Sequence, residues 1–475
     1  MVTSDSQLPV ASGRQLMIAI ALGAFLSHFT AGIVNVSLPQ FADSFNSRLD
    51  TVQWITTGYL LVITILLPLM GKLGDRFGSG IIHNAGLGLF TLSSLLIVFS
   101  PGISSLLAFR FIQAVGAAMF QATNMALLAK LMPAEKRGQA LGIISGAVAI
   151  GGMAGPAAGG LIGQSLSWHW LFIIQVPFAA VASLLAFRFI PLLHHRTDRN
   201  GSFDVTGAML FMSAIGLLVA GLSHSGTENG VMRASFFYTG GIGLAALIVF
   251  LLWERKHPTP FLPMRALAVP AVSIGLLIST VTFMAANTVI VSLPFFFYSF
   301  AVLSSSSVGL LMTIYPACLA IAGPIAGRWS DRLGSRRLLL IGLLSMGSGM
   351  AVLALTLANF PMISAIAGLA LCGLGMALIA SPNMNFIMSH TAKEHIGSVG
   401  GLIALTRNLG LVIGASLGLG TVKGSSIGEQ NWTLFHMVMI LLIGLCVILM
   451  ALIIWSTREQ LAKRLTSLSY RNSVK

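Results

Sequence analysis

Long apolar segments separated by short polar ones run along nearly the whole chain. Each is close to the length of about 20 residues that an α-helix needs to cross a hydrocarbon core of roughly 30 Å. The fourteen predicted spans are 16–38, 52–70, 81–100, 104–131, 139–163, 170–191, 205–223, 235–253, 269–297, 307–327, 337–358, 361–388, 398–422 and 433–455. The first is too long for the core of a signal peptide, so we expect it to remain as a span. The pattern predicts an all-α polytopic membrane protein.

The basic residues indicate the orientation of these helices. Loops after even-numbered spans contain many of them, such as Lys72 and Lys136, whereas the opposite loops contain only Arg48, Arg233 and Lys423. Loops rich in Lys and Arg stay in the cytoplasm. We therefore expect both termini to be cytoplasmic, in a multi-pass protein of the cell membrane (the plasma or inner membrane).

Composition supports the membrane class and argues against others. The chain is 56% hydrophobic, with a mean hydropathy of +0.89. Its net charge of +14 is distributed in short clusters between spans, which indicates membrane orientation and not nucleic-acid binding. Cys318, Cys372 and Cys446 lie in apolar segments without the spacing of metal ligands. No nucleotide-binding, metalloprotease or nucleophile motif is present, so we expect no enzyme activity, cofactor or metal.

One polar turn occurs twice, after the second span and after the tenth. Both copies have the pattern G-x-x-x-D-R-x-G, and we call them the signature turns. Their residues are Gly71, Asp75, Arg76 and Gly78 in the first copy and Gly327, Asp331, Arg332 and Gly334 in the second. The glycines permit a tight turn, and the carboxylate can cap a helix or pair with arginine. The turns are predicted to act as a cytoplasmic gate; the alternative is a charge cluster that only sets topology.

The spacing of the two copies predicts how the chain is divided. Eight spans separate them, whereas a repeat of two six-helix halves would separate them by six, so two spans are inserted. Paired helical halves are typical of transporters. The predicted units are a six-helix half over 1–200, two inserted helices over 201–265, a second half over 266–455, and a basic cytoplasmic tail over 456–475.

Over almost its whole length the sequence resembles the fourteen-helix drug:proton antiporter family of the major facilitator superfamily. The signature turns match that superfamily's loop motif. Span 5 resembles the antiporter pattern G-x-x-x-G-P-x-x-G-G through Gly151, Gly155, Pro156, Gly159 and Gly160. Small residues at this spacing also permit ordinary close helix packing, which remains the alternative.

Span 4 contains "RFIQAVGAA", which resembles the family pattern R-x-x-Q-G-x-G-A. Arg110 and Gln113 share a helix face, and a charge within the membrane costs several kcal/mol unless it is paired or hydrated. The resemblance implies that this arginine takes part in proton movement. A structural arginine near the outer interface is the alternative.

Span 1 departs from the family, which places an acid where this chain has Thr30. All thirteen acidic residues fall in loops or at span ends, so no carboxylate is predicted in mid-membrane. His28 is the nearest titratable substitute. It lies on a different helix face from Thr30, and a packed histidine is the alternative to a proton carrier.

The remaining polar residues within spans are candidates for a substrate pathway, although each could instead bridge two helices. They are Asn35, Gln121, Asn124, Asn287, Tyr315, Asn383, Asn385 and Arg407. Together these features predict an exporter of small amphipathic compounds that works by alternating access as a monomer in the lipid bilayer. Proton exchange is the implied energy source. An uncoupled facilitator, a carrier of lipid-like substrates and a transporter-shaped ligand sensor are the alternatives.

Overall fold

The computed structural model describes most of the predicted spans. It covers residues 10–132, 137–192, 204–223, 227–228, 231–232, 234–257, 262, 264–299, 304–391, 396–421 and 432–473. The predicted boundary near residue 200 lies outside these residues.

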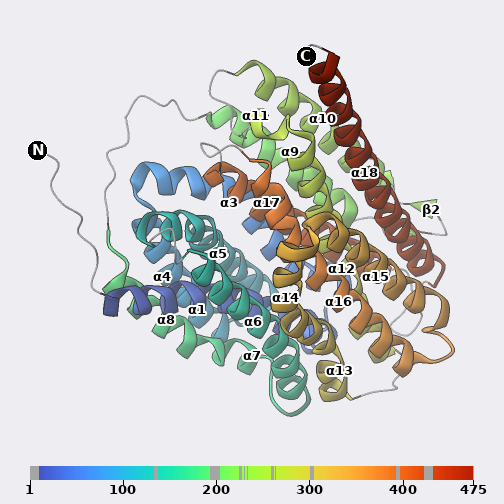
Figure 1. Ribbon diagram of the computed structural model, residues 1–475. Coiled ribbons are helices and arrows are strands. Elements are labelled where there is room, and N and C mark those ends of the chain that lie inside the picture. The colour runs from blue at the N-terminus through green and yellow to red at the C-terminus, as the bar shows by residue number, and fades with distance from the viewer. Residues whose placement is uncertain are drawn as a thin grey trace, which may run out of the picture.

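The described residues fold almost entirely into helices, arranged as a bundle (Figure 1). The first group comprises α1 (Val10–Ser44), α2 (Leu49–Val52), α3 (Trp54–Phe77), α4 (Ser79–Val98), α5 (Ile103–Leu131), α6 (Arg137–Ser165), α7 (His169–Ile173) and α8 (Gln175–Phe189). A hairpin of α9 (Val205–Ser223) and α10 (Ala234–Lys256) follows, and then α11 (Met264–Leu267). The last group comprises α12 (Pro270–Ser299), α13 (Ser305–Met312), α14 (Ile314–Leu333), α15 (Ser335–Thr356), α16 (Pro361–Ser389), α17 (Ile396–Gly420) and α18 (Trp432–Ser473).

The predicted all-α polytopic fold is confirmed. Within the described residues, 13 segments are long and apolar enough to cross a membrane, and α9 supplies a shorter apolar helix over Val205–Gly221. Two predicted spans are each divided into two helices, α7 with α8 and α13 with α14. Pro177 and Pro316 follow the two breaks, and each lacks the N–H that would bond the carbonyl four residues earlier, at the last residue of α7 and of α13.

Two further differences concern segments outside the apolar pattern. The α9–α10 connection contains a ribbon of β1 (Thr227–Glu228) and β2 (Val231–Met232), in which Thr227 is opposite Met232. Helix α18 continues to Ser473, well beyond the predicted span end at 455. Its last turns contain many Leu, Glu, Gln, Lys and Arg residues, which favour a helix without being apolar enough to predict a span.

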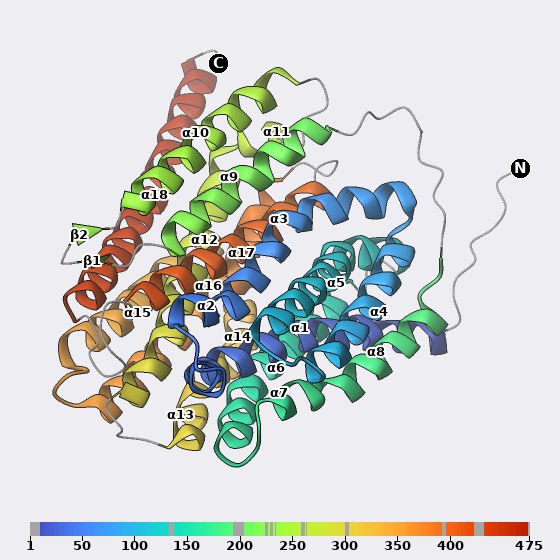
Figure 2. The same ribbon diagram turned by 180° about the vertical axis from the view of Figure 1, so that it is seen from behind.

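Helix α9 of the hairpin lies beside α17 in both views (Figures 1 and 2). Helix α9 packs against α10, α3 and α17. Buried apolar side chains of α9, such as Phe211 and Ile215, belong to the same core cluster as residues of the first helical group and of α17. A second cluster is formed mainly by α12 to α16 and α18. The hairpin therefore contacts helices from both groups.

The two signature turns have the same backbone conformation. Gly78 ends α3 with φ 103° and Gly334 ends α14 with φ 84°, and these are the two glycines with positive φ among the described residues. Each N–H bonds the carbonyl four residues back, on Gly74 or Ser330, and the next helix begins immediately. Side chains other than hydrogen are strained at such φ values, which explains why both copies of the motif end in glycine.

Candidate functional site

Arg110 lies at the centre of the predicted site, on α5, and its side chain is 0% exposed. Its Nε donates to the carbonyl oxygen of Ile55 at 3.2 Å. Its Nη1 donates to Thr30 Oγ1 at 2.9 Å and to Gln113 Oε1 at 2.5 Å. The guanidinium therefore connects α5 to α1 and α3, through Thr30 and the carbonyl of Ile55.

A second set of contacts fixes the orientation of this group. Gln113 Nε2 donates to Ser94 Oγ at 2.7 Å, and Ser94 Oγ donates in turn to the carbonyl of Phe90 at 2.6 Å. The guanidinium carbon lies 3.9 Å from the ring centroid of Tyr59. Such cation–π contacts are strongest where water is excluded. Ser94 and the contact with Tyr59 were not predicted, since both depend on how α3, α4 and α5 pack.

The Arg110 cluster is positively charged. Its acceptors are a hydroxyl, an amide and a backbone carbonyl, and in the described part of the chain none of them is a carboxylate. Nη2 is buried and has no hydrogen-bond acceptor among the described residues. The cluster can therefore offer an N–H donor and a positive charge to a group that approaches it.

His28 of the first helical group lies near Arg407 of the second. The His28 ring contacts the carbonyl oxygen of Ala24 through Nδ1 at 3.1 Å, and Arg407 of α17 lies within electrostatic range of it. Gln121 Nε2 donates to Ser27 Oγ at 2.8 Å, which joins α5 to α1 one residue before His28. His28 and Thr30 both lie on α1, but the hydrogen bond to Arg110 is made by Thr30.

The predicted asparagines have different surroundings. Asn287 Nδ2 donates to the carbonyl of Leu411 at 2.6 Å, and Asn383 Nδ2 donates to that of Gly275 at 2.8 Å, so both bridge helices within the second group. Asn35, Asn124 and Tyr315 are buried, whereas Asn385 is exposed on α16.

The glycines of the antiporter pattern lie on the face of α6 that contacts α1. A Cβ on Gly151, Gly155 or Gly159 would come within 2.5 to 2.8 Å of a carbonyl oxygen of Phe25, Phe29 or Ile33. Only hydrogen fits at these three positions without moving the backbone of α1.

The same stretch of α6 also contacts the second helical group. A Cβ on Gly309 of α13 would lie 2.7 Å from both the Cα of Gly160 and the carbonyl oxygen of Pro156. Helix α14 contacts α6 as well, and Cβ of Pro316 is 3.7 Å from where a Cβ on Gly152 would be. The antiporter pattern therefore lies between the two groups.

Asp75 and Arg76 of the first signature turn are exposed, as is Arg332 of the second. The side chain of Asp331 lies outside the described residues. Lys72, also in the first turn, is half-buried and interacts electrostatically with Glu254 and Asp204 of the hairpin. The turn is thus connected to the inserted helices as well as to its own half.

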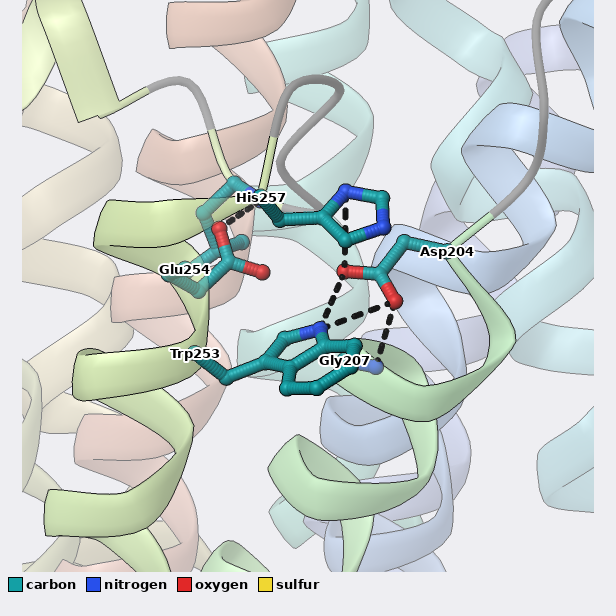
Figure 3. A network of polar contacts seen from close by, with 6 residues as sticks. Asp204, Gly207, Trp253, Glu254 and His257 are labelled. Carbon is teal, nitrogen blue, oxygen red and sulfur yellow. Dashed lines mark hydrogen bonds and ion pairs between the residues drawn. The ribbon is translucent and has the colours of Figure 1, made fainter.

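Asp204 and Glu254 form a buried acidic pair at the end of the hairpin (Figure 3). Asp204 caps α9 by accepting the Gly207 N–H at 2.7 Å, and both of its oxygens accept from Trp253 Nε1 at 3.1 Å. Glu254 accepts the Leu262 N–H at 3.0 Å. Burial at 3% and 2% exposure was not predicted, because both residues lie at span ends where water normally solvates a carboxylate.

Sequence comparison identifies the family. The family described as Major Facilitator Superfamily matches residues 20–206 and 275–468. The chain belongs to the Major Facilitator Superfamily. Members are transporters and not enzymes, so the protein is a secondary transporter of the cell membrane. The interval between the two matched segments contains most of α9 and all of α10 and α11.

Relatives within this superfamily have different substrates. The chain is 32% identical over 421 residues to the riboflavin transporter RibZ of Clostridioides difficile. These residues are 88% of this chain and 89% of the relative. It is 28% identical to the multidrug resistance protein Stp of Mycobacterium tuberculosis, covering 86% of this chain and 75% of the relative. A crystal structure of the peptide transporter POT with sulfate has a TM-score of 0.69 at 14% identity, covering 92% and 94% of the two chains. That similarity supports the major facilitator fold.

Proposed function

We propose that the protein is a secondary active exporter of small amphipathic compounds that works by alternating access between two six-helix halves. The observation that carries this proposal is the location of the antiporter pattern between α1 and α13. A carrier must bring its two halves together at one end of the bundle and separate them there later, and glycine contacts allow close approach without interlocked side chains. Relatives named for multidrug resistance support the substrate class.

The Arg110 cluster determines the preferred charge of the substrate. A buried guanidinium held by neutral groups repels a permanent cation and attracts a carbonyl or carboxylate. We therefore expect neutral, zwitterionic and anionic amphiphiles to be better substrates than lipophilic cations.

Proton coupling is the proposed energy source. Because Thr30 replaces the usual acid, the proton would use His28, an acid at a loop edge such as Asp43, or the substrate itself. In this proposal, Arg110 provides a fixed positive charge in the bundle, and binding and release of the proton occur in its electrostatic field.

A flavin carrier is the second candidate. It is favoured by the 32% identical riboflavin transporter and by the Tyr59 ring 3.9 Å from the Arg110 guanidinium carbon, since aromatic and cationic groups suit a flat, polar ring system. Such a carrier could operate without a proton.

The test uses purified protein in proteoliposomes that contain a pH-sensitive dye. A neutral amphiphile, riboflavin and a permanent dication are added in separate experiments. If the proposal holds, only the neutral amphiphile should drive proton movement. The variant Arg110→Ala should abolish that movement. Substrate exchange without proton movement would indicate an uncoupled facilitator, and saturable binding without exchange would indicate a sensor.

A further inference from the structure

A pocket of about 610 Å³ opens at the end of the bundle where the signature turns lie. It is formed by the second turn, the end of α16 and the face of α18 opposite them. The lining residues used below are Ser335, Arg336, Arg337, Phe386, His390 and Ile454. By the distribution of basic loops, this end is the cytoplasmic one.

The mouth of the pocket is basic. Arg336, Arg337 and His390 supply three cationic or polar nitrogen-bearing side chains, and the described lining residues include no carboxylate. His390 is held in place because its Nδ1 contacts the carbonyl oxygen of Phe386 at 2.8 Å. The backbone N–H groups at the start of α15 lie next to Ser335 in the wall of the pocket. Arginine pairs and a helix N-terminus together suit a phosphate group.

The interior of the pocket is apolar and continues onto the outer surface of the helices. The Arg336 guanidinium lies 5.6 Å from the Phe386 ring centroid, so its stem and that ring form one wall. Ile454 of α18 is 46% exposed, and Ile341 and Leu344 on the next turns of α15 are 52% and 60% exposed. In a membrane-spanning helix such side chains face lipid hydrocarbon.

We propose that this pocket binds the phosphate headgroup of an anionic membrane phospholipid. The phosphate pairs with Arg336 and Arg337, and the acyl chains lie along the exposed apolar surface of α15 and α18. Free inorganic phosphate shares the charge chemistry but has nothing to place against the apolar wall. Cytoplasmic leaflets contain anionic lipids that basic clusters attract. A lipid bound here joins the second signature turn to α18, so it fixes the position of that turn relative to the membrane surface.

The test is lipid binding to the purified protein, measured by native mass spectrometry in detergent. Phosphatidylglycerol, phosphatidylcholine and inorganic phosphate are the three probes, each titrated separately and then in competition. The variant R336Q/R337Q removes both arginines from the pocket. The matched control R188Q/R328Q removes two exposed arginines that do not line it.

We expect the native protein and the control to bind phosphatidylglycerol at least several-fold more tightly than phosphatidylcholine. The variant R336Q/R337Q should bind phosphatidylglycerol roughly tenfold more weakly. Equal binding of both lipids by the native protein would overturn the proposal whether or not the variant folds. An equal loss in the control would show that overall charge, and not this pocket, attracts the lipid. Displacement of the lipid by millimolar inorganic phosphate would show that the pocket is an anion site without lipid selectivity, which also contradicts the proposal.

Discussion

At the scale of single residues, the decisive feature is the hydrogen bond between Arg110 and Thr30. The Thr30 hydroxyl accepts one N–H of the guanidinium at 2.9 Å but cannot neutralise its charge. Burial of an unneutralised charge is costly, and the contacts with Gln113, Ile55 and Tyr59 offset that cost through charge-assisted hydrogen bonds of about 1.5–3 kcal/mol each and a cation–π contact. The cluster is therefore a fixed positive centre.

Thr30→Asp should change the charge selectivity of transport. The new carboxylate would pair with Arg110 and cancel its charge, so export of a permanent cation should rise by about fivefold, the factor for about 1 kcal/mol of electrostatic energy. Export assays with matched cationic and neutral compounds measure this change. Thr30→Val is the control, because it removes the hydroxyl acceptor without adding charge and should not improve cation export. Strong export of a dication by the native protein, unchanged in Thr30→Asp, would contradict the assignment.

At the scale of elements, close helix contact depends on individual glycines. In α6, Gly155 faces the backbone of α1, with 2.7 Å to the Phe29 carbonyl for an added Cβ. Gly146 of the same helix has no neighbour within 4 Å of an added Cβ. Helix α6 thus has one glycine, Gly155, that has no room for a Cβ and another, Gly146, that has room for one.

Gly155→Ala should destabilise the protein by about 1–3 kcal/mol, because two backbones must separate to admit the methyl group. Gly146→Ala should be neutral or slightly stabilising, since alanine favours a helix. Thermal unfolding in detergent, followed by intrinsic fluorescence, compares the two variants. Similar midpoints for both would show that the α1–α6 contact adapts without strain.

The hairpin is connected to the first signature turn through charge. Lys72→Met should lower the thermal midpoint, because it removes a cation that interacts with the buried carboxylates of Asp204 and Glu254. Adding Glu254→Gln should restore part of the loss, since one of the two buried carboxylates that Lys72 balanced is then neutral. A double-mutant cycle on the thermal midpoints measures this coupling, with Arg76→Gln as an exposed control on the same turn. Additive effects of Lys72→Met and Glu254→Gln would exclude an interaction between them.

At the scale of the whole molecule, the two helical groups meet where α6 contacts α13 and α14. Cβ of Pro316 lies 3.7 Å from the position of a Cβ on Gly152, which matches the usual separation of Cβ atoms in a disulfide of about 3.5–4.5 Å. A covalent bond there would join the two groups near the middle of α6, which runs from Arg137 to Ser165.

The variant G152C/P316C, in a background without the three native cysteines, should form this bond under mild oxidation. Transport should stop in the oxidised protein and return after reduction, because alternating access requires these helices to separate. Proteoliposome uptake before and after reductant gives the readout, and each single-cysteine variant under the same oxidant is the control. Undiminished transport by fully cross-linked protein would contradict alternating access at this contact.

The orientation of the whole molecule can be tested separately. Single cysteines at Asp198 and Lys393 should react with an impermeant reagent only after the membrane is opened, since both belong to loops predicted to be cytoplasmic. A cysteine at Arg233 should react in intact cells. Labelling of Asp198 or Lys393 from outside would reverse the predicted topology.

The sequence determined the class of the protein and the extent of most of its spans. A segment of about 20 apolar residues has no stable alternative to a helix in hydrocarbon, because every backbone group must bond within its own segment. Local chemistry likewise determined the turns at Gly78 and Gly334, where φ is positive. None of these features needs information from a distant part of the chain.

Only the tertiary structure decided which polar residues meet. Thr30, Ser94 and Arg110 come from three helices, and nothing in their spacing indicates that Arg110 bonds Thr30 or that Gln113 bonds Ser94. The same is true of Lys72 and Glu254, which are far apart in the chain. The apolar face of a membrane helix is solvated equally well by lipid and by another helix, so hydrophobicity does not determine which helices pack together. Close contacts, hydrogen bonds and buried charges make that selection, and they exist only once the helices have packed.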